Sequence, residues 1–171
     1  MILNGKEKYI YVFNQCDFEK ICLLNGYNDD SLSTDKEIYD NFAFISILGT
    51  SESLKYAGEE DNSHLFKKPN RSVLNVEFDD VDSDTNIDGY CFKAISQEQA
   101  DEIFDFIENN IGKTFLIHCR AGESRSAAIG QFIKEIHSDI YSENKDDWKT
   151  YNHCVYRKLY RSFYNKNELF V

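Results

Sequence analysis

Residues 117–126 read Ile117-His118-Cys119-Arg120-Ala121-Gly122-Glu123-Ser124-Arg125-Ser126, which places a cysteine six positions before an arginine. The run Thr114–Ile117 precedes this segment and residues at helical spacing follow it, so we expect a strand, a short loop that turns at Gly122, and a helix starting near Arg125. Backbone N–H groups of such a loop and the amino end of the helix attract anions. Cys119 at the floor of the loop would be held as thiolate, and Arg125 could bind two oxygens of an oxyanion. The segment therefore predicts a site for chemistry on phosphate esters.

The composition of the chain is that of a small globular protein. Its 171 residues are 42% hydrophobic and include one proline and eight glycines. This is enough to build one domain with its own core over residues 1–171, and it argues against a disordered or fibrous chain. The net charge of -11 disfavours nucleic acid and anionic membrane surfaces as main partners, because both are polyanions. A local basic pocket remains compatible with this charge.

The five cysteines at positions 16, 22, 91, 119 and 154 are odd in number and irregularly spaced. They form no CxxC pair and no Cys/His ligand set, so neither a disulfide framework nor a zinc site is expected, and no cofactor is predicted. The first residues, Met1–Lys6, lack the apolar segment of a secretory signal. No apolar run is long enough to span a bilayer. We therefore expect a cytoplasmic protein.

Other parts of the chain predict further strands and helices. Three strands are expected, at Tyr9–Phe13, Phe42–Ile47 and Val73–Phe78, because these runs are rich in β-branched and aromatic residues or alternate in polarity. Between the first two, Asp17 is expected to cap a short helix that ends before Gly26.

Two longer helices flank the Cys119 segment. Ser96, with Gln99 three positions later, predicts a capping box that starts a helix ending at Gly112. A last helix is predicted from the apolar spacing between Val155 and Phe163. Residues 28–40 are expected to form a loop, and residues 51–70 a surface excursion.

The alternation of strands and helices predicts a three-layer α/β domain. Its central sheet would be mostly parallel, with four to five strands, and would be flanked by helices.

The motif His118-Cys119-x-Ala121-Gly122-x-Ser124-Arg125-Ser126 resembles the signature of cysteine-dependent protein phosphatases, particularly the small dual-specificity type. The resemblance covers most of the chain, from the strand before an acidic turn to the helix after the signature. The N-terminal part and residues 51–70 match only in pattern. The resemblance implies a protein tyrosine phosphatase-like fold.

The same resemblance implies a role for each residue of the signature. Cys119 would be the nucleophile that forms a phosphocysteine, and Arg125 would bind the equatorial oxygens of the phosphoryl group. Ser126 would donate a hydrogen bond to the thiolate, and His118 would orient the loop and favour the thiolate. The phosphate would be held by the N–H groups of Arg120, Ala121, Gly122, Glu123, Ser124 and Arg125. The alternative for Cys119 is an ordinary buried core cysteine.

The leaving group needs a proton, so a general acid on another loop is required. In the related phosphatases an aspartate follows a strand ahead of the signature, and the run Val76-Glu77-Phe78-Asp79-Asp80 fits this pattern. Aligning the end of the strand puts Asp80 at the acid position. Asp79 and Asp82 are the competitors, and a merely solvated acidic turn is the simplest alternative.

Glu123 departs from the pattern of the family. Many relatives have an apolar residue at this position, and those that act on phosphoinositides tend to have lysine. A carboxylate at the rim of the pocket would repel additional phosphates, which makes a polyphosphorylated inositide a poorer substrate. The positive charge of Arg120 would instead attract additional phosphates. The alternative is that the side chains of Glu123 and Arg120 both face solvent.

The sequence as a whole predicts a metal-independent enzyme that hydrolyses phosphotyrosine, with phosphoserine and phosphothreonine as further substrates, in proteins or peptides. Two alternatives remain open. The first is a phosphatase that acts on RNA 5′ ends, nucleotides or lipids. The second is a phosphate-binding module with little or no turnover.

Overall fold

The computed structural model describes residue 3 and residues 8–68, 70–142 and 150–167. Most of Met1–Lys6, on which the expectation about a secretory signal rests, lies outside these residues. So do Pro69 and the segment 143–149.

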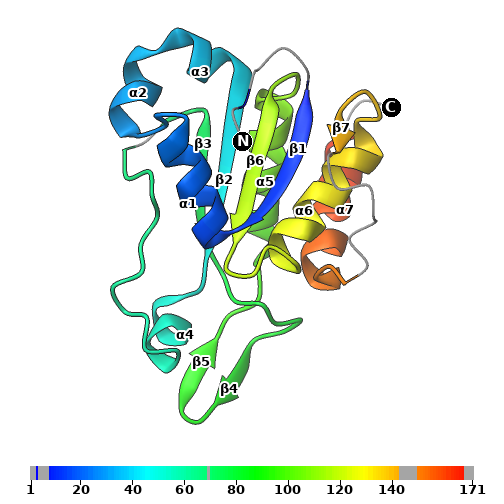
Figure 1. Cartoon of the computed structure of the whole chain (residues 1–171). Helices are drawn as coiled ribbons and strands as arrows, with labels where there is room; N and C mark the ends of the chain where they lie inside the picture. The colour runs from blue at the N-terminus through cyan, green and yellow to red at the C-terminus, as the bar shows by residue number, and fades with distance from the viewer. Residues whose placement is uncertain (1–2, 4–7, 69, 143–149, 168–171) are drawn as a thin grey trace.

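Five strands form one sheet, in the order β3-β2-β6-β1-β7, and every pairing between them is parallel within the described residues (Figure 1). The strands are Tyr9–Asn14 (β1), Phe42–Leu48 (β2), Val73–Glu77 (β3), Thr114–Cys119 (β6) and Tyr141–Ser142 (β7). The predicted parallel sheet of four to five strands flanked by helices is thus confirmed, with five strands.

Helices cover both faces of the sheet (Figure 1). One face packs on α1 (Gln15–Leu24), α2 (Asp29–Thr34) and α3 (Lys36–Asn41), and the other on α5 (Gln97–Asn109), α6 (Arg125–Ile136) and α7 (His153–Asn167).

The sequence of β2 explains why this strand can be covered on both sides. Phe42 and Phe44 belong to the aromatic core beneath α1, whereas Ala43 and Ile45 belong to the larger core beneath α5 and α6. All seven residues of β2 are buried. Alternate side chains point to opposite faces of a sheet, so a continuous apolar run is what a strand between two helical layers needs.

The parallel pairing brings the carboxyl ends of four strands to one edge of the sheet. In the register, Asn14 of β1 lies opposite Cys119 of β6, and Leu48 of β2 lies opposite Glu77 of β3. The residues that follow these positions therefore meet at this edge, where the candidate site lies.

Two predictions about the N-terminal third were wrong. Residues 28–40 are not a plain loop, because Asn28 begins α2 with a capping box and Asp35 caps α3 through its carboxylate. Asp17 is not the cap of α1: the cap is Asn14, whose side-chain oxygen accepts a hydrogen bond from the N–H of Asp17. Short polar helices of this kind lack the apolar periodicity on which the prediction relied.

The expected surface excursion at residues 51–70 begins with a short helix, α4 (Ser51–Tyr56). A two-stranded hairpin, β4 (Thr85–Ile87) and β5 (Tyr90–Phe92), lies beside it. The Tyr56 ring packs edge-on against the rings of Tyr90 and Phe92, with centroids 5.4 and 5.5 Å away. These two elements extend beyond the carboxyl edge of the sheet (Figure 1).

Within the ranges described above, none of the helices has both the length and the apolar character that crossing a bilayer requires.

Candidate active site

The Cys119 loop, defined here as residues 119–125, joins β6 to α6 at the edge of the sheet. Gly122 turns the loop with a φ of 76°, a conformation that side chains disfavour. A Cβ atom at this position would lie 2.5 Å from both the backbone nitrogen of Asn14 and the carbonyl carbon of Phe13. The loop therefore packs directly on the junction between β1 and α1, and only glycine fits there.

Cys119 is buried at the floor of this loop. Its Sγ atom accepts hydrogen bonds from the Ser126 hydroxyl at 3.1 Å and from the Gly122 N–H at 3.3 Å. Burial raises the pKa of the Cys119 thiol, but the hydrogen bonds from Ser126 and Gly122 and the charge of Arg125 outweigh it and hold this pKa below the ordinary value. The predicted thiolate is thus supported by named donors.

Arg125 is the first residue of α6 and is 7% exposed. Its Nη1 atom donates to the carbonyl oxygens of Leu48 at 3.1 Å and Phe78 at 2.6 Å, which follow β2 and β3. Nε is buried and donates to no atom of the described residues. One edge of the guanidinium is thus fixed to the sheet, and the Nε edge keeps donor capacity for two oxygens of an anion.

The amino end of α6 has no side-chain cap. Ser124 occupies the N-cap position but makes no capping hydrogen bond. Its hydroxyl instead donates to Asp80 Oδ1 at 2.7 Å. Because serine normally satisfies the first N–H groups of a helix, this arrangement leaves the positive end of α6 to an anion bound in the loop.

Asp80 lies in the turn after β3, at the mouth of the cavity that contains Cys119 and Arg125. Its Oδ1 atom accepts from Ser124 and, at 2.8 Å, from the side-chain amide of Asn152. Among the described residues both donors contact Oδ1, and no donor contacts Oδ2. The structure therefore brings Asp80, the preferred candidate for the general acid, to the same cavity as Cys119 and Arg125.

Asp79, the neighbouring residue, also lines this cavity, but it has different hydrogen-bond partners. It is 3% exposed and accepts hydrogen bonds from the Thr50 N–H and hydroxyl, the Ser53 hydroxyl and the Lys93 N–H. Burial raises the pKa of this carboxyl, but the donors outweigh it, so its pKa is lowered. A carboxylate held ionised by this many donors is a structural anchor and a poor proton donor.

Asp82, the third candidate, is exposed and lines a neighbouring surface depression with Tyr151 and His153. It is absent from the lining of the Cys119 cavity.

His118 is 2% exposed and packs its ring on Phe18, with centroids 4.2 Å apart. Its Nε2 atom lies 2.7 Å from the Ser46 hydroxyl on the adjacent strand. Burial lowers the pKa of His118 to about 4. The ring is therefore neutral at neutral pH, and its roles in orienting the loop and favouring the thiolate stay predictions.

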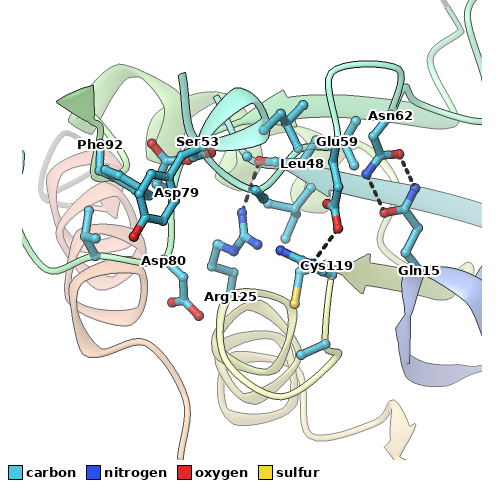
Figure 2. A pocket seen from close by; sticks show the side chains of 18 of the residues that line it. Gln15, Leu48, Ser53, Glu59, Asn62, Asp79, Asp80, Phe92, Cys119 and Arg125 are labelled. Atoms are coloured by element: carbon cyan, nitrogen blue, oxygen red, sulfur yellow. Dashed lines mark hydrogen bonds and ion pairs between the residues drawn. The ribbon is translucent and has the colours of Figure 1, made fainter. Parts of the chain in front are cut away.

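The cavity has a volume of about 650 Å³ and is drawn in Figure 2. Cys119 and Arg125 lie at one end of it, and α4 and the hairpin wall the other. Most of the lining outside the Cys119 loop is apolar, formed by Ile47, Leu48, Leu54, Tyr56, Ala57, Val81, Ile87 and Phe92. A cavity with one anion-binding end and one apolar wall suits a phosphate ester with a hydrophobic group attached.

Of the two charged residues expected near the rim of the pocket, Arg120 lines the cavity and Glu123 does not. Arg120 forms an ion pair with Glu59. Glu123 is exposed. Beside the ion pair, Gln15 and Asn62 exchange two side-chain hydrogen bonds, at 2.7 and 3.0 Å, which tie the segment after α4 to α1 (Figure 2).

Several residues of the site were missed by sequence analysis. Asn152 caps α7 by accepting from the Val155 N–H, and its amide also holds Asp80. Its capping role could have been predicted from an asparagine just ahead of a helical run. No local signal indicates the contact with Asp80, nor the bond between Ser46 and His118.

Within the described residues, no group of three or more histidine, cysteine or acidic side chains could hold a metal ion. No protein-family model, no curated protein and no solved structure matches this chain.

Proposed function

We propose that this protein is a phosphomonoesterase that hydrolyses phosphotyrosine in proteins, and also phosphoserine and phosphothreonine, through a phosphocysteine intermediate. The observation that carries this proposal is the pairing of Cys119 with Arg125 in one cavity. The Cys119 sulfur accepts from Ser126 and Gly122, and the buried Arg125 keeps its Nε unpaired within the described residues. The chain would accordingly be a cysteine-dependent phosphatase of the small dual-specificity type, with the corresponding fold.

In the first step the Cys119 thiolate attacks phosphorus and the bond from phosphorus to the ester oxygen breaks. Asp80 gives its proton to the departing oxygen, so that the alcohol or phenol leaves neutral. Arg125 and the N–H groups of the loop bind the phosphoryl oxygens, where negative charge is held in the transition state. The products are the free alcohol and a phosphocysteine.

In the second step a water molecule attacks phosphorus while Asp80, now a carboxylate, accepts its proton. The bond between sulfur and phosphorus breaks, and inorganic phosphate and the Cys119 thiolate are released. The Ser126 hydroxyl, 3.1 Å from Sγ, stabilises the departing thiolate. This returns Cys119 to its starting state and leaves the proton on Asp80.

The apolar wall of the cavity supports an aromatic phosphate ester as substrate. Tyr56 and Ile87 are 47% and 40% exposed, and both line the cavity that Phe92 also borders. Large exposed apolar side chains at a cavity mouth favour a ring over a small polar alcohol. The net charge of -11 argues against RNA, nucleotides or anionic lipid surfaces as substrates.

The five cysteines are all free thiols. This supports a reducing compartment, and we propose the cytoplasm.

The test is hydrolysis of a phosphotyrosine peptide and a phosphothreonine peptide by the purified protein in the presence of a chelator. We expect release of phosphate, faster from phosphotyrosine, and its loss in Cys119→Ser, because a serine hydroxyl is hardly ionised at neutral pH. Arg125→Lys should also lose activity, since lysine cannot supply a planar pair of donors. Wild-type rates in either variant would refute the assigned roles.

The same experiment separates the alternatives. A phosphate-binding module would bind phosphate or vanadate but release none from any ester. Faster turnover of an RNA 5′ phosphate, a nucleotide or a phospholipid than of both peptides would favour the non-protein phosphatase.

A further inference from the structure

A buried serine hydroxyl bridges two histidine rings behind the Cys119 loop. Ser46 Oγ lies 2.7 Å from His118 Nε2 and 2.7 Å from His64 Nδ1. Ser46 is 1% exposed and lies opposite His118 in the register of β2 and β6, whereas His64 lies in the connection between α4 and β3. On the outer side of His64, Nε2 lies 3.7 Å from Glu77 Oε1.

Both rings of this arrangement are neutral at neutral pH. Burial lowers the pKa of His118 to about 4, against a hydrogen bond with the backbone of Cys119, and the nearby His64 and Arg125 lower it further. Burial also lowers the pKa of His64, although Glu77 opposes this. A neutral imidazole has one N–H donor and one acceptor nitrogen.

These facts restrict where the hydrogens lie. The Ser46 hydroxyl has a single hydrogen, so it donates to one ring nitrogen and must accept from the other. His118 Nδ1 makes no hydrogen bond of good geometry with the described residues, yet a hydrogen bond of the ring with the backbone of Cys119 raises its pKa. The single Ser46 hydrogen therefore couples the two rings: a hydrogen on Nε2 of His118 requires one on Nε2 of His64, and a hydrogen on Nδ1 of His118 requires one on Nδ1 of His64.

We propose that Ser46 and His64 are positioning residues for the Cys119 loop, because together they hold His118 in one tautomer and one ring orientation. His118 directly precedes Cys119, so its ring fixes the backbone from which the loop starts. Gly122 N–H and Ser126 Oγ must both reach Sγ, at 3.3 and 3.1 Å, and this alignment depends on that backbone. We call Glu77, His64, Ser46 and His118 the Ser46 relay.

The relay rests on the proposed function only in taking Cys119 as the reacting group, and it can be tested without turnover. The first measurement is the ¹⁵N chemical shifts of the imidazole nitrogens, assigned with a His→Gln variant of each of the four histidines. We expect a single tautomer for each ring, with the hydrogen on Nε2 in both or on Nδ1 in both. Opposite tautomers in the two rings, or a mixture of tautomers in His118, would overturn the relay.

The second measurement is the rate of Cys119 alkylation by iodoacetamide as a function of pH. We expect Ser46→Ala to raise the pKa of the thiol and to slow alkylation at pH 6 about threefold to tenfold, since the buried His118 ring then loses its hydrogen bond. His64→Ala should act in the same direction. His64→Asn should restore much of the wild-type rate, because its side-chain amide has both an acceptor and a donor that can take the place of Nδ1.

Ser72→Ala is the matched control. Ser72 is also a fully buried serine with two side-chain hydrogen bonds, to the Tyr39 carbonyl oxygen and from Lys113, but it lies at the amino end of β3, away from the site. Its loss should lower thermal stability without changing the alkylation profile.

A double-mutant cycle completes the test. Ser46→Ala should add little to the effect of His64→Ala on alkylation, because both act through the same ring. Additive effects, or an alkylation profile that Ser46→Ala changes no more than Ser72→Ala does, would show that the relay only stabilises the fold. If the relay passes these tests but no ester is hydrolysed, the proposed function fails and the relay stands.

Discussion

The Ser124 hydroxyl donates a hydrogen bond of 2.7 Å to Asp80 Oδ1, although the two residues are 44 positions apart in the chain. This bond joins the Cys119 loop to the turn after β3. Asn152 adds a second bond to the same oxygen at 2.8 Å. The position of Asp80 relative to Cys119 therefore depends on contacts between three separate loops, and these contacts distinguish it from the other aspartates of the turn.

Asp80→Asn should lower turnover of phosphotyrosine about a hundredfold or more, the usual cost of removing a general acid. Substrates with very acidic leaving groups should lose far less, because their leaving groups depart without a proton. The measurement is kcat for a series of aryl phosphates of decreasing leaving-group pKa. Asp82→Asn, an exposed change in the same turn, is the control and should leave the series unchanged. A leaving-group dependence in Asp79→Asn instead of Asp80→Asn would show that the acid is the neighbouring residue.

Asp79→Asn should act on stability. The amide nitrogen of asparagine would face several of the donors from Thr50, Ser53 and Lys93 that now contact the carboxylate. We expect a loss of about 2 kcal/mol in the free energy of unfolding, measured by urea denaturation at pH 7.

The environment of Asp79 also predicts how the free energy of unfolding depends on pH. The folded-state pKa of Asp79 is lowered, because hydrogen bonds from Ser53, Lys93 and Thr50 outweigh the effect of burial. At acidic pH the Asp79 carboxyl thus binds fewer protons in the folded chain than in the unfolded chain, where its pKa is about 3.9. Its contribution is fully present above that value and is lost as the pH falls through the lower folded pKa. The stability difference between wild type and Asp79→Asn should be constant from pH 7 to pH 5 and shrink below about pH 4. A difference that grows with acidity would contradict the lowered pKa.

Gly122→Ala should reduce kcat/KM about a hundredfold, because misplacing catalytic groups by about 1 Å has this cost. The new methyl would meet the backbone of Phe13 and Asn14 at 2.5 Å, so the loop must move and carry Cys119 with it. Gly112→Ala is the matched control, since Gly112 also has a positive φ, of 89°, but has open space around it. The control should lose stability and keep its activity. Equal loss of activity in both variants would show that backbone strain alone is responsible.

Four of the five strands of the sheet and the long helices could be predicted because their signals are local. The seven buried residues of β2 form an apolar run, and Ser96 with Gln99 forms the predicted capping box. The Cys119 loop was predicted for the same reason, since its residues are consecutive.

The rest of the site depends on contacts between distant segments. Asp79 and Asp80 are adjacent residues of the same type. Only their hydrogen-bond partners in other segments indicate that Asp79 is a structural anchor and that Asp80 is the candidate acid. The hairpin β4–β5 has strands of three residues each, too short to give a periodic pattern. Ser46 lies in an apolar run, where sequence alone does not indicate two histidine partners.

The cysteines of this chain provide the last test, because their environments differ. Cys119 has two hydrogen-bond donors on its sulfur and a lowered pKa, whereas burial raises the pKa of Cys22. We expect iodoacetamide at pH 6 to label Cys119 first, with vanadate giving protection by occupying the loop. Ser126→Ala should slow this labelling about tenfold, since it removes the nearest donor to the thiolate, and should leave the rate at pH 9 nearly unchanged. Mass spectrometry after brief labelling measures both rates. Faster labelling of the exposed Cys16, with no effect of vanadate, would mean that the loop does not activate its thiol.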